Sequence, residues 1–96
     1  MSLQFEWNTE KATSNLKKHK VSFDEASTVF DDPLAQVFDD EDHSIGEQRE
    51  IIIGHSILDR LLLVCFTERV EDHIHIFSAR LTTKKERKDY EENPSL

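Results

Sequence analysis

The chain has few residues of the kinds that stabilise small secreted or membrane proteins. Its 96 residues include one cysteine, two glycines and two prolines. The single cysteine, Cys65, cannot form an internal disulfide, and its apolar neighbours predict a buried small hydrophobic residue rather than a reactive thiol. The longest apolar run, Leu61 to Phe66, is far too short to cross a bilayer, and residues 1–7 lack the features of a secretory signal. These absences predict a cytoplasmic protein with no membrane contact and a single domain over residues 1–96.

Positive charge is also scarce. Twelve lysines and arginines face 20 aspartates and glutamates, which gives a net charge of −8. Non-specific nucleic-acid binding depends mainly on basic residues that neutralise phosphates, so this balance argues against a coat protein and against direct DNA binding. Residues 31–50 hold eight acidic residues and one basic residue, Arg49. Lysines and arginines gather before and after this segment, so a basic face can coexist with an acidic one.

Hydrophobic periodicity predicts a strand and two helices in the first third of the chain. Residues 3–7 alternate between apolar and polar side chains, which is typical of a short strand with one buried face. A helix is predicted from residue 8 or 9 to about residue 19. Ser22 and Glu25 form the pattern of a capping box at the start of a second helix, which Pro33 ends.

The rest of the chain predicts a sheet and one more helix. A short strand is possible at residues 34–38, and three apolar runs follow at residues 50–55, 60–67 and 73–79. Connections this short force antiparallel neighbours, and the fully apolar middle run is expected at the centre. Thr83 and Glu86 form a second capping box that opens a terminal helix. The prediction is an α+β fold of order βααβββα or βααββββα, with the helices on one face of an antiparallel sheet.

Three arginines lie at the ends of the predicted strands. Arg49 precedes one strand, Arg69 follows the next and Arg80 ends the third. The planar guanidinium group matches phosphate oxygens, and neighbouring strand ends can place such groups around one substrate. This pattern suits cleavage of RNA by its own 2′-hydroxyl, which needs positive groups for the phosphorane, a base for the hydroxyl proton and an acid for the leaving 5′-oxygen.

Several side chains are candidates for moving protons. Glu47, His43 and His19 could act as base or acid, and Tyr90 could orient the substrate or donate a proton. We rank four candidates, Arg80, Arg69, Glu47 and Arg49, above the other three, His43, Tyr90 and His19.

Structural interpretations of the same residues stay open. Arg49 with Glu47, and Arg69 with Glu68 or a neighbour, could form structural ion pairs. Tyr90 could simply pack the last helix onto the sheet. Two further histidines, His73 and His75, share a strand face and could hold zinc together with His43 or His55.

A series of short motifs extends over residues 5–91. In order they are Phe5-x-Trp7, Lys11, Asn15, Lys18-His19-x-Val21-x-Phe23-x-Glu25-Ala26, His43-Ser44-x-Gly46-Glu47-x-Arg49, Leu62-x-Val64-x-Phe66-Thr67-Glu68-Arg69, Ile76-x-Ser78-Ala79-Arg80 and Glu86-Arg87-x-x-Tyr90-Glu91. Together, in this order and spacing, they resemble the BrnT family of type II toxin–antitoxin toxins. The resemblance implies a RelE-like fold and a metal-independent endoribonuclease, without a cofactor, that blocks translation. It also implies a BrnA antitoxin partner with a ribbon-helix-helix DNA-binding end.

The chain departs from the family pattern at three positions. Asn8 stands where the family usually has aspartate, and either residue caps a helix. Lys20 stands where glycine is common, and a left-handed backbone there would store about 1 kcal/mol of strain. His75 stands where basic residues are frequent, which predicts weaker and more pH-dependent phosphate binding. With the net charge of −8, this last departure motivates the alternative of a non-catalytic interaction module or degenerate toxin that binds a basic partner.

Overall fold

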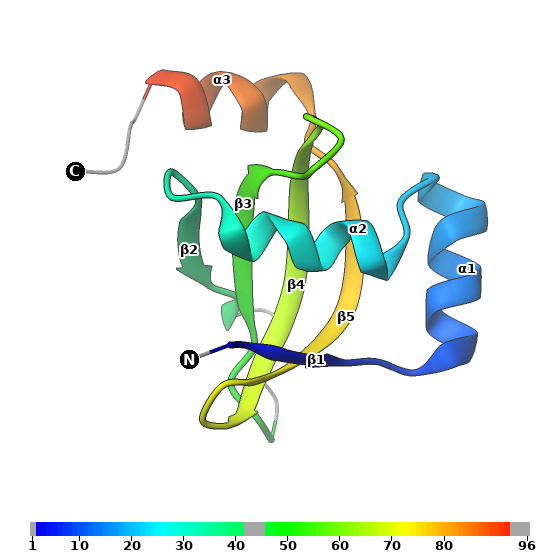
Figure 1. Ribbon diagram of the computed structural model, residues 1–96. Helices are drawn as coiled ribbons and strands as arrows, with labels where there is room; N and C mark the ends of the chain where they lie inside the picture. The colour runs from blue at the N-terminus through cyan, green and yellow to red at the C-terminus, as the bar shows by residue number, and fades with distance from the viewer. Residues whose placement is uncertain (1, 42–45, 93–96) are drawn as a thin grey trace.

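The computed structural model describes residues 2–41 and 46–92 and has the longer of the two predicted element orders, βααββββα (Figure 1). The strands are β1 (Gln4–Glu6), β2 (Gln36–Asp39), β3 (Glu50–His55), β4 (Leu61–Val70) and β5 (His73–Leu81). The helices are α1 (Thr9–His19), α2 (Phe23–Thr28), the short 3₁₀ helix η1 (Val29–Asp31) and α3 (Lys84–Glu92).

One five-stranded sheet, in the order β1-β5-β4-β3-β2, organises the molecule. Strands β2 to β5 are antiparallel to their neighbours, and β4 lies at the centre as its apolar sequence predicts. The expectation of a wholly antiparallel sheet is wrong for β1, which pairs with β5 in parallel. Residues 7–72 separate these two strands, and a long connection is what a parallel pair requires.

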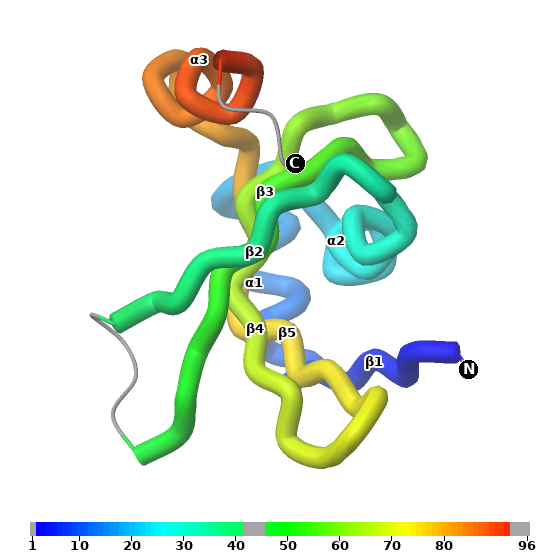
Figure 2. Tube along the Cα trace, turned by 90° about the vertical axis from the view of Figure 1, so that its left-hand side faces the viewer, coloured from blue at the N-terminus to red at the C-terminus, as the bar shows by residue number. Residues whose placement is uncertain are grey.

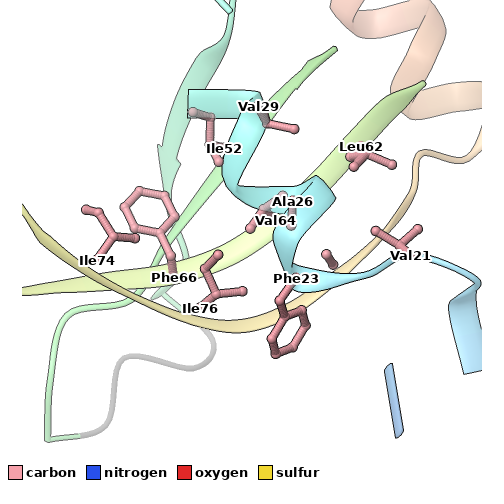
Figure 3. Close-up of a cluster of buried hydrophobic side chains, with 11 residues drawn as sticks. Val21, Phe23, Ala26, Val29, Ile52, Leu62, Val64, Phe66, Ile74 and Ile76 are labelled. Carbon is pink, nitrogen blue, oxygen red and sulfur yellow. The ribbon is translucent and has the colours of Figure 1, made fainter. Parts of the chain in front are cut away.

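The hydrophobic core lies between one face of the sheet and helix α2 (Figure 3). Alternate residues of the strands, such as Ile52, Val64 and Ile76, point to this side and are buried. Phe30 of η1 extends the core, because its ring lies 5.0 Å from that of Phe66 and 5.2 Å from that of Phe5, centroid to centroid. The strand residues that alternate with these buried ones point to the opposite face of the sheet, which we call the open face.

Helix α1 lies beside the outer edge of β5 (Figure 1) and is fixed there by a buried amide. The Asn15 side chain donates to the carbonyl oxygens of Val21, at 3.0 Å, and Ala79, at 2.8 Å. Its Oδ1 atom accepts from the Ala79 amide at 3.1 Å. Asn15 therefore pairs with β5 as a neighbouring strand would, and every polar atom of its amide group is satisfied.

The capping box predicted at the start of α2 forms only in part. Ser22 accepts from the Glu25 amide at 3.0 Å, as predicted. The Glu25 carboxylate does not return this bond, because it is buried and binds Arg60 and Ser56 instead. The Arg60 guanidinium also donates to the Lys20 carbonyl at 3.0 Å. Glu25 thus joins the start of α2 to the turn between β3 and β4, and Arg60 holds the pKa of this carboxyl below its ordinary value.

The last helix is the one that does not follow the prediction of helices on a single face. Figure 2 shows α3 on the opposite side of the sheet from α2. Its sequence, KKERKDYEE, has no apolar stripe, and none of its residues is buried. A helix of this composition has little to gain from the core side. The predicted Thr83–Glu86 capping box is confirmed, with bonds of 3.1 Å and 2.8 Å in the two directions.

Lys20 follows α1 with φ 59° and ψ 29°, in the left-handed conformation that glycine adopts without strain. We therefore expect Lys20→Gly to raise the free energy of unfolding by about 1 kcal/mol, because glycine relieves the backbone strain. The hydrogen bond from Arg60 is kept, because its acceptor is the backbone carbonyl of residue 20. Lys18→Gly, inside the helix, is the matched control and should lower it by about 1 kcal/mol. Urea denaturation measures both, and a destabilised Lys20→Gly protein would contradict the argument.

Candidate active site

The centre of the open face carries a phenylalanine between two cations. The Arg49 guanidinium lies 3.8 Å from the centroid of the Phe77 ring, and the Lys11 Nζ atom lies 5.8 Å from it. Arg49 precedes β3, Lys11 belongs to α1 and Phe77 to β5, so three separate segments meet here. Cations at such distances are attracted by the electron-rich face of the ring.

Strand β5 contains a β-bulge at Phe77. Cys65 pairs with Ser78, whereas the next residue of β4, Phe66, pairs with Ile76, so Phe77 is the extra residue. The bulge lets Ile76 and Ala79 both reach the core although they are three residues apart. As a result, Phe77 and Ser78 follow each other on the open face.

Arg69 lies next to this group and pairs with Glu47. Its Nε atom is 3.5 Å from the Glu47 carboxylate, and both side chains are partly exposed. Of the ion pairs considered from the sequence, that of Arg69 forms with a neighbour, Glu47. A groove of about 400 Å³ adjoins the pair, and it is lined by Glu47, Gln48, Glu50, Thr67, Glu68 and Arg69.

His75, on β5, packs against Phe77 and interacts electrostatically with Arg69 and Glu47. The ring is 4.9 Å from that of Phe77, centroid to centroid, and the strand register places His75 beside Glu6 of β1 and Thr67 of β4. Burial, Arg69 and Lys11 lower the pKa of the imidazole, and Glu6 and Glu47 partly offset this. The sequence pointed to His75 only as a departure from a family pattern, and it pointed to Phe77 not at all. Two apolar residues, Ile76 and Phe77, between polar neighbours give no local signal of a bulge.

Arg80 occupies the other half of the open face. It pairs with Leu63 on β4, whereas His75 pairs with Thr67, four residues away, which is roughly 13 Å along the strand. Both terminal nitrogens of Arg80 donate to the Glu86 carboxylate, at 2.8 Å and 3.0 Å. This two-pronged bond joins β5 to the first turn of α3. The Arg80 hydrogen bonds, and those from Thr83, lower the Glu86 pKa from 4.5 to about 2.

A comparison with family models shows to which class of protein the chain belongs. Residues 7–86 match the family model described as the ribonuclease toxin BrnT of a type II toxin–antitoxin system. The chain belongs to the BrnT toxin family. A search of the curated proteins found no match.

The fold agrees with a solved member of the BrnT family. The crystal structure of the Brucella abortus ribonuclease toxin BrnT is similar with a TM-score of 0.66 and 19% sequence identity. The match covers 86% of the present chain and 100% of the Brucella chain. At this identity the likeness shows that the fold is shared.

Two further candidates of this BrnT-family chain, Tyr90 and His19, lie apart from the Phe77 group. Tyr90 donates to the Leu34 carbonyl at 3.2 Å and contacts the His55 ring edge to face at 5.9 Å, so it packs α3 onto the sheet. Burial raises its pKa. His19, half-buried, ends α1, and none of the hydrogen bonds or ion pairs between described residues joins it to an arginine. His43 lies outside the described residues.

The structure does not assemble the zinc site that includes His55. That residue pairs with Leu61 and contacts Tyr90, far along the sheet from His73 and His75. Within residues 2–41 and 46–92, no group of three or more histidines, cysteines or acidic residues could hold a metal ion. None of the helices in the same residues is long and apolar enough to cross a membrane.

The Arg80–Glu86 bond predicts acid sensitivity at the α3 end. The Glu86 pKa is depressed in the folded protein, so its stabilising effect is complete above pH 4.5 and is lost as pH falls towards 2. After a discount for the partial exposure of both side chains, we expect a loss of about 1–2 kcal/mol in the free energy of unfolding. Glu86→Gln should remove this part of the pH dependence, and Glu92→Gln, in the last turn of α3, should not. Urea denaturation at pH 3 to 7 would refute the assignment if wild type and Glu86→Gln lost stability equally.

Proposed function

We propose that this chain is an active endoribonuclease of the BrnT family, which inhibits translation in the cytoplasm and is neutralised by a BrnA-like ribbon-helix-helix antitoxin. The observation that carries the proposal is the convergence of Lys11, Arg49 and Arg69 on Phe77 and His75. Family membership supplies the general class of ribonuclease toxin. The open face supplies a place where a phosphate could meet cations and a titratable group.

The chemistry requires no metal or cofactor in this proposal. The RNA 2′-hydroxyl attacks the adjacent phosphorus, and Arg49 and Arg69 stabilise the negative charge that builds up on the phosphate oxygens. Arg69 is available because its bond to Glu47 is long and exposed, and such pairs are weak. Phe77 offers an aromatic surface near the same groups, on which a base could stack.

Arg80 has a different status among the candidates. Arg80 donates two hydrogen bonds to the Glu86 carboxylate. It can bind a phosphate only if these two bonds break. We therefore propose that Arg80 first positions α3 beside the sheet. Glu47 and Tyr90 stay candidates for proton transfer or substrate orientation, as do His19 and His43.

Replacement of Arg69 tests the ribonuclease proposal. Arg69→Ala should reduce the rate of RNA cleavage about 100-fold, since removal of one group that stabilises transition-state charge typically has such an effect. Arg87→Ala is the matched control, because Arg87 makes an equally long ion pair with Glu91 on α3. The measurement is cleavage of a labelled oligoribonucleotide, together with growth arrest in a bacterial host. Unfolding curves should be nearly unchanged in both variants.

The rival function is a non-catalytic module that binds a basic partner. Its support is that Arg69 and Arg80 both pair with carboxylates in a chain of net charge −8. Harmless expression of the wild type, with no cleavage of RNA, would favour this module. If the Arg69→Ala and Arg87→Ala proteins both cleaved RNA as fast as the wild type, Arg69 would not be part of the active site.

The acidic segment after β2 is our proposed dock for the antitoxin. Asp39 and Glu50 are direct neighbours across β2 and β3. Burial and the charges of Asp39 and Glu68 raise the pKa of Glu50, so like charges are crowded there. Basic residues of a partner would relieve this repulsion.

The affinity of the complex should therefore fall as salt rises. The double variant Asp39→Asn/Glu50→Gln should weaken binding and flatten its dependence on ionic strength, because exposed charge pairs are screened by salt. Glu71→Gln, in the turn between β4 and β5, is the control and should behave as wild type. Titration calorimetry with a BrnA-like antitoxin at several salt concentrations measures this. An affinity that is constant across them would place the dock elsewhere.

A further inference from the structure

His75 has an unusual environment for a histidine on an exposed sheet face. Its Nδ1 atom is fully buried and has no hydrogen-bond partner among the described residues. The ring packs against Phe77, and its strand neighbours are Glu6 and Thr67. The remaining ring nitrogen, Nε2, is the one through which His75 can exchange a proton with a bound molecule.

This environment opposes the charged form of the imidazole. Nδ1 is buried, so the ring loses part of the hydration that a positive charge needs. Arg69 of β4 and Lys11 of α1 add repulsion, while Glu6 of β1 and Glu47 before β3 reduce it. The pKa of the ring is therefore lowered, and the neutral ring accepts a proton at Nε2 in the tautomer that carries its hydrogen on Nδ1.

The same cations that disfavour protonation are placed to hold an RNA phosphate. Arg69 acts on His75 electrostatically, and Arg49 lies on the ring that His75 contacts. A phosphodiester held by these groups brings its ribose close to the imidazole. Glu47, the other candidate nearby, lies 3.5 Å from the Arg69 guanidinium.

We propose that His75 is the general base of RNA cleavage, an inference that rests on the proposed ribonuclease function. Nε2 takes the proton of the 2′-hydroxyl as the 2′-oxygen forms its bond to phosphorus and the bond from phosphorus to the 5′-oxygen breaks. The 5′-oxygen takes a proton from water, and the imidazolium returns its proton to water. The products are a 2′,3′-cyclic phosphate and a 5′-hydroxyl, so protons and electrons balance.

A pH–rate profile with matched variants tests this role. Wild type should cleave an oligoribonucleotide at a rate that rises with pH, with a midpoint below pH 6.5, and then levels off where the base is neutral. His75→Gln should lower the plateau by about 100-fold or more and remove the rise. His75→Ala should be equally slow and should recover activity in added imidazole. His73→Gln, two residues away on the same strand face, is the control and should keep the wild-type profile.

The outcomes separate this inference from the function on which it rests. An active wild type together with an equally active His75→Gln protein, with the same pH profile, would overturn the role of His75 and leave the ribonuclease standing. A wild type without activity would overturn both. Thermal unfolding of every variant shows that the fold is kept, and the imidazole rescue of His75→Ala distinguishes lost chemistry from lost structure.

Discussion

Side-chain alternation across β3, β4 and β5 is the constraint on which both the core and the candidate site depend. Because neighbouring residues of a strand point to opposite faces, the positions that bury Ile52, Val64 and Ile76 against α2 also decide which residues reach the open face. The bulge at Phe77 lets the residues before it and after it, Ile76 and Ala79, both face the core. Without the extra residue, a strand that buried Ile76 would turn Ala79 away from the core and Ser78 towards it. The core therefore sets the composition of the site.

The buried amide of Asn15 links this sheet to the one cation that comes from a helix. Asn15 fixes α1 to Ala79 of β5, two residues beyond Phe77. Lys11 lies four residues before Asn15, one turn away on the same side of the helix. The bond at Asn15 thus brings Lys11 to the Phe77 ring, and it explains why a residue on an edge helix contributes to the open face.

Local signals predicted much of the fold, and they failed where distant parts of the chain compete. Asn8 and Thr83 begin helices as their side chains predict, since a cap involves only near neighbours. Glu25 does not complete its capping box, because Arg60, 35 residues away, offers a charged donor in a buried place. Tertiary contacts likewise determine the ion-pair partner of Arg69, the direction of β1 and the face of the sheet on which α3 lies. Hydrophobic periodicity in the sequence carries no information about these contacts. The arginines could be named as candidates from the sequence, but the grouping of Arg49 with Phe77, apart from Arg80, could not.

The division of the arginines also explains how a chain of net charge −8 could hold an anionic substrate. Around His75, the cations Lys11, Arg49 and Arg69 outnumber the facing carboxylates Glu6 and Glu47. The Arg80–Glu86 pair lies roughly 13 Å along the sheet from His75, and charges are largely screened beyond about 8 Å at physiological salt. The local excess of cations, rather than the total charge, therefore sets the field that a phosphate would meet. A net negative charge on the whole chain is therefore compatible with this site.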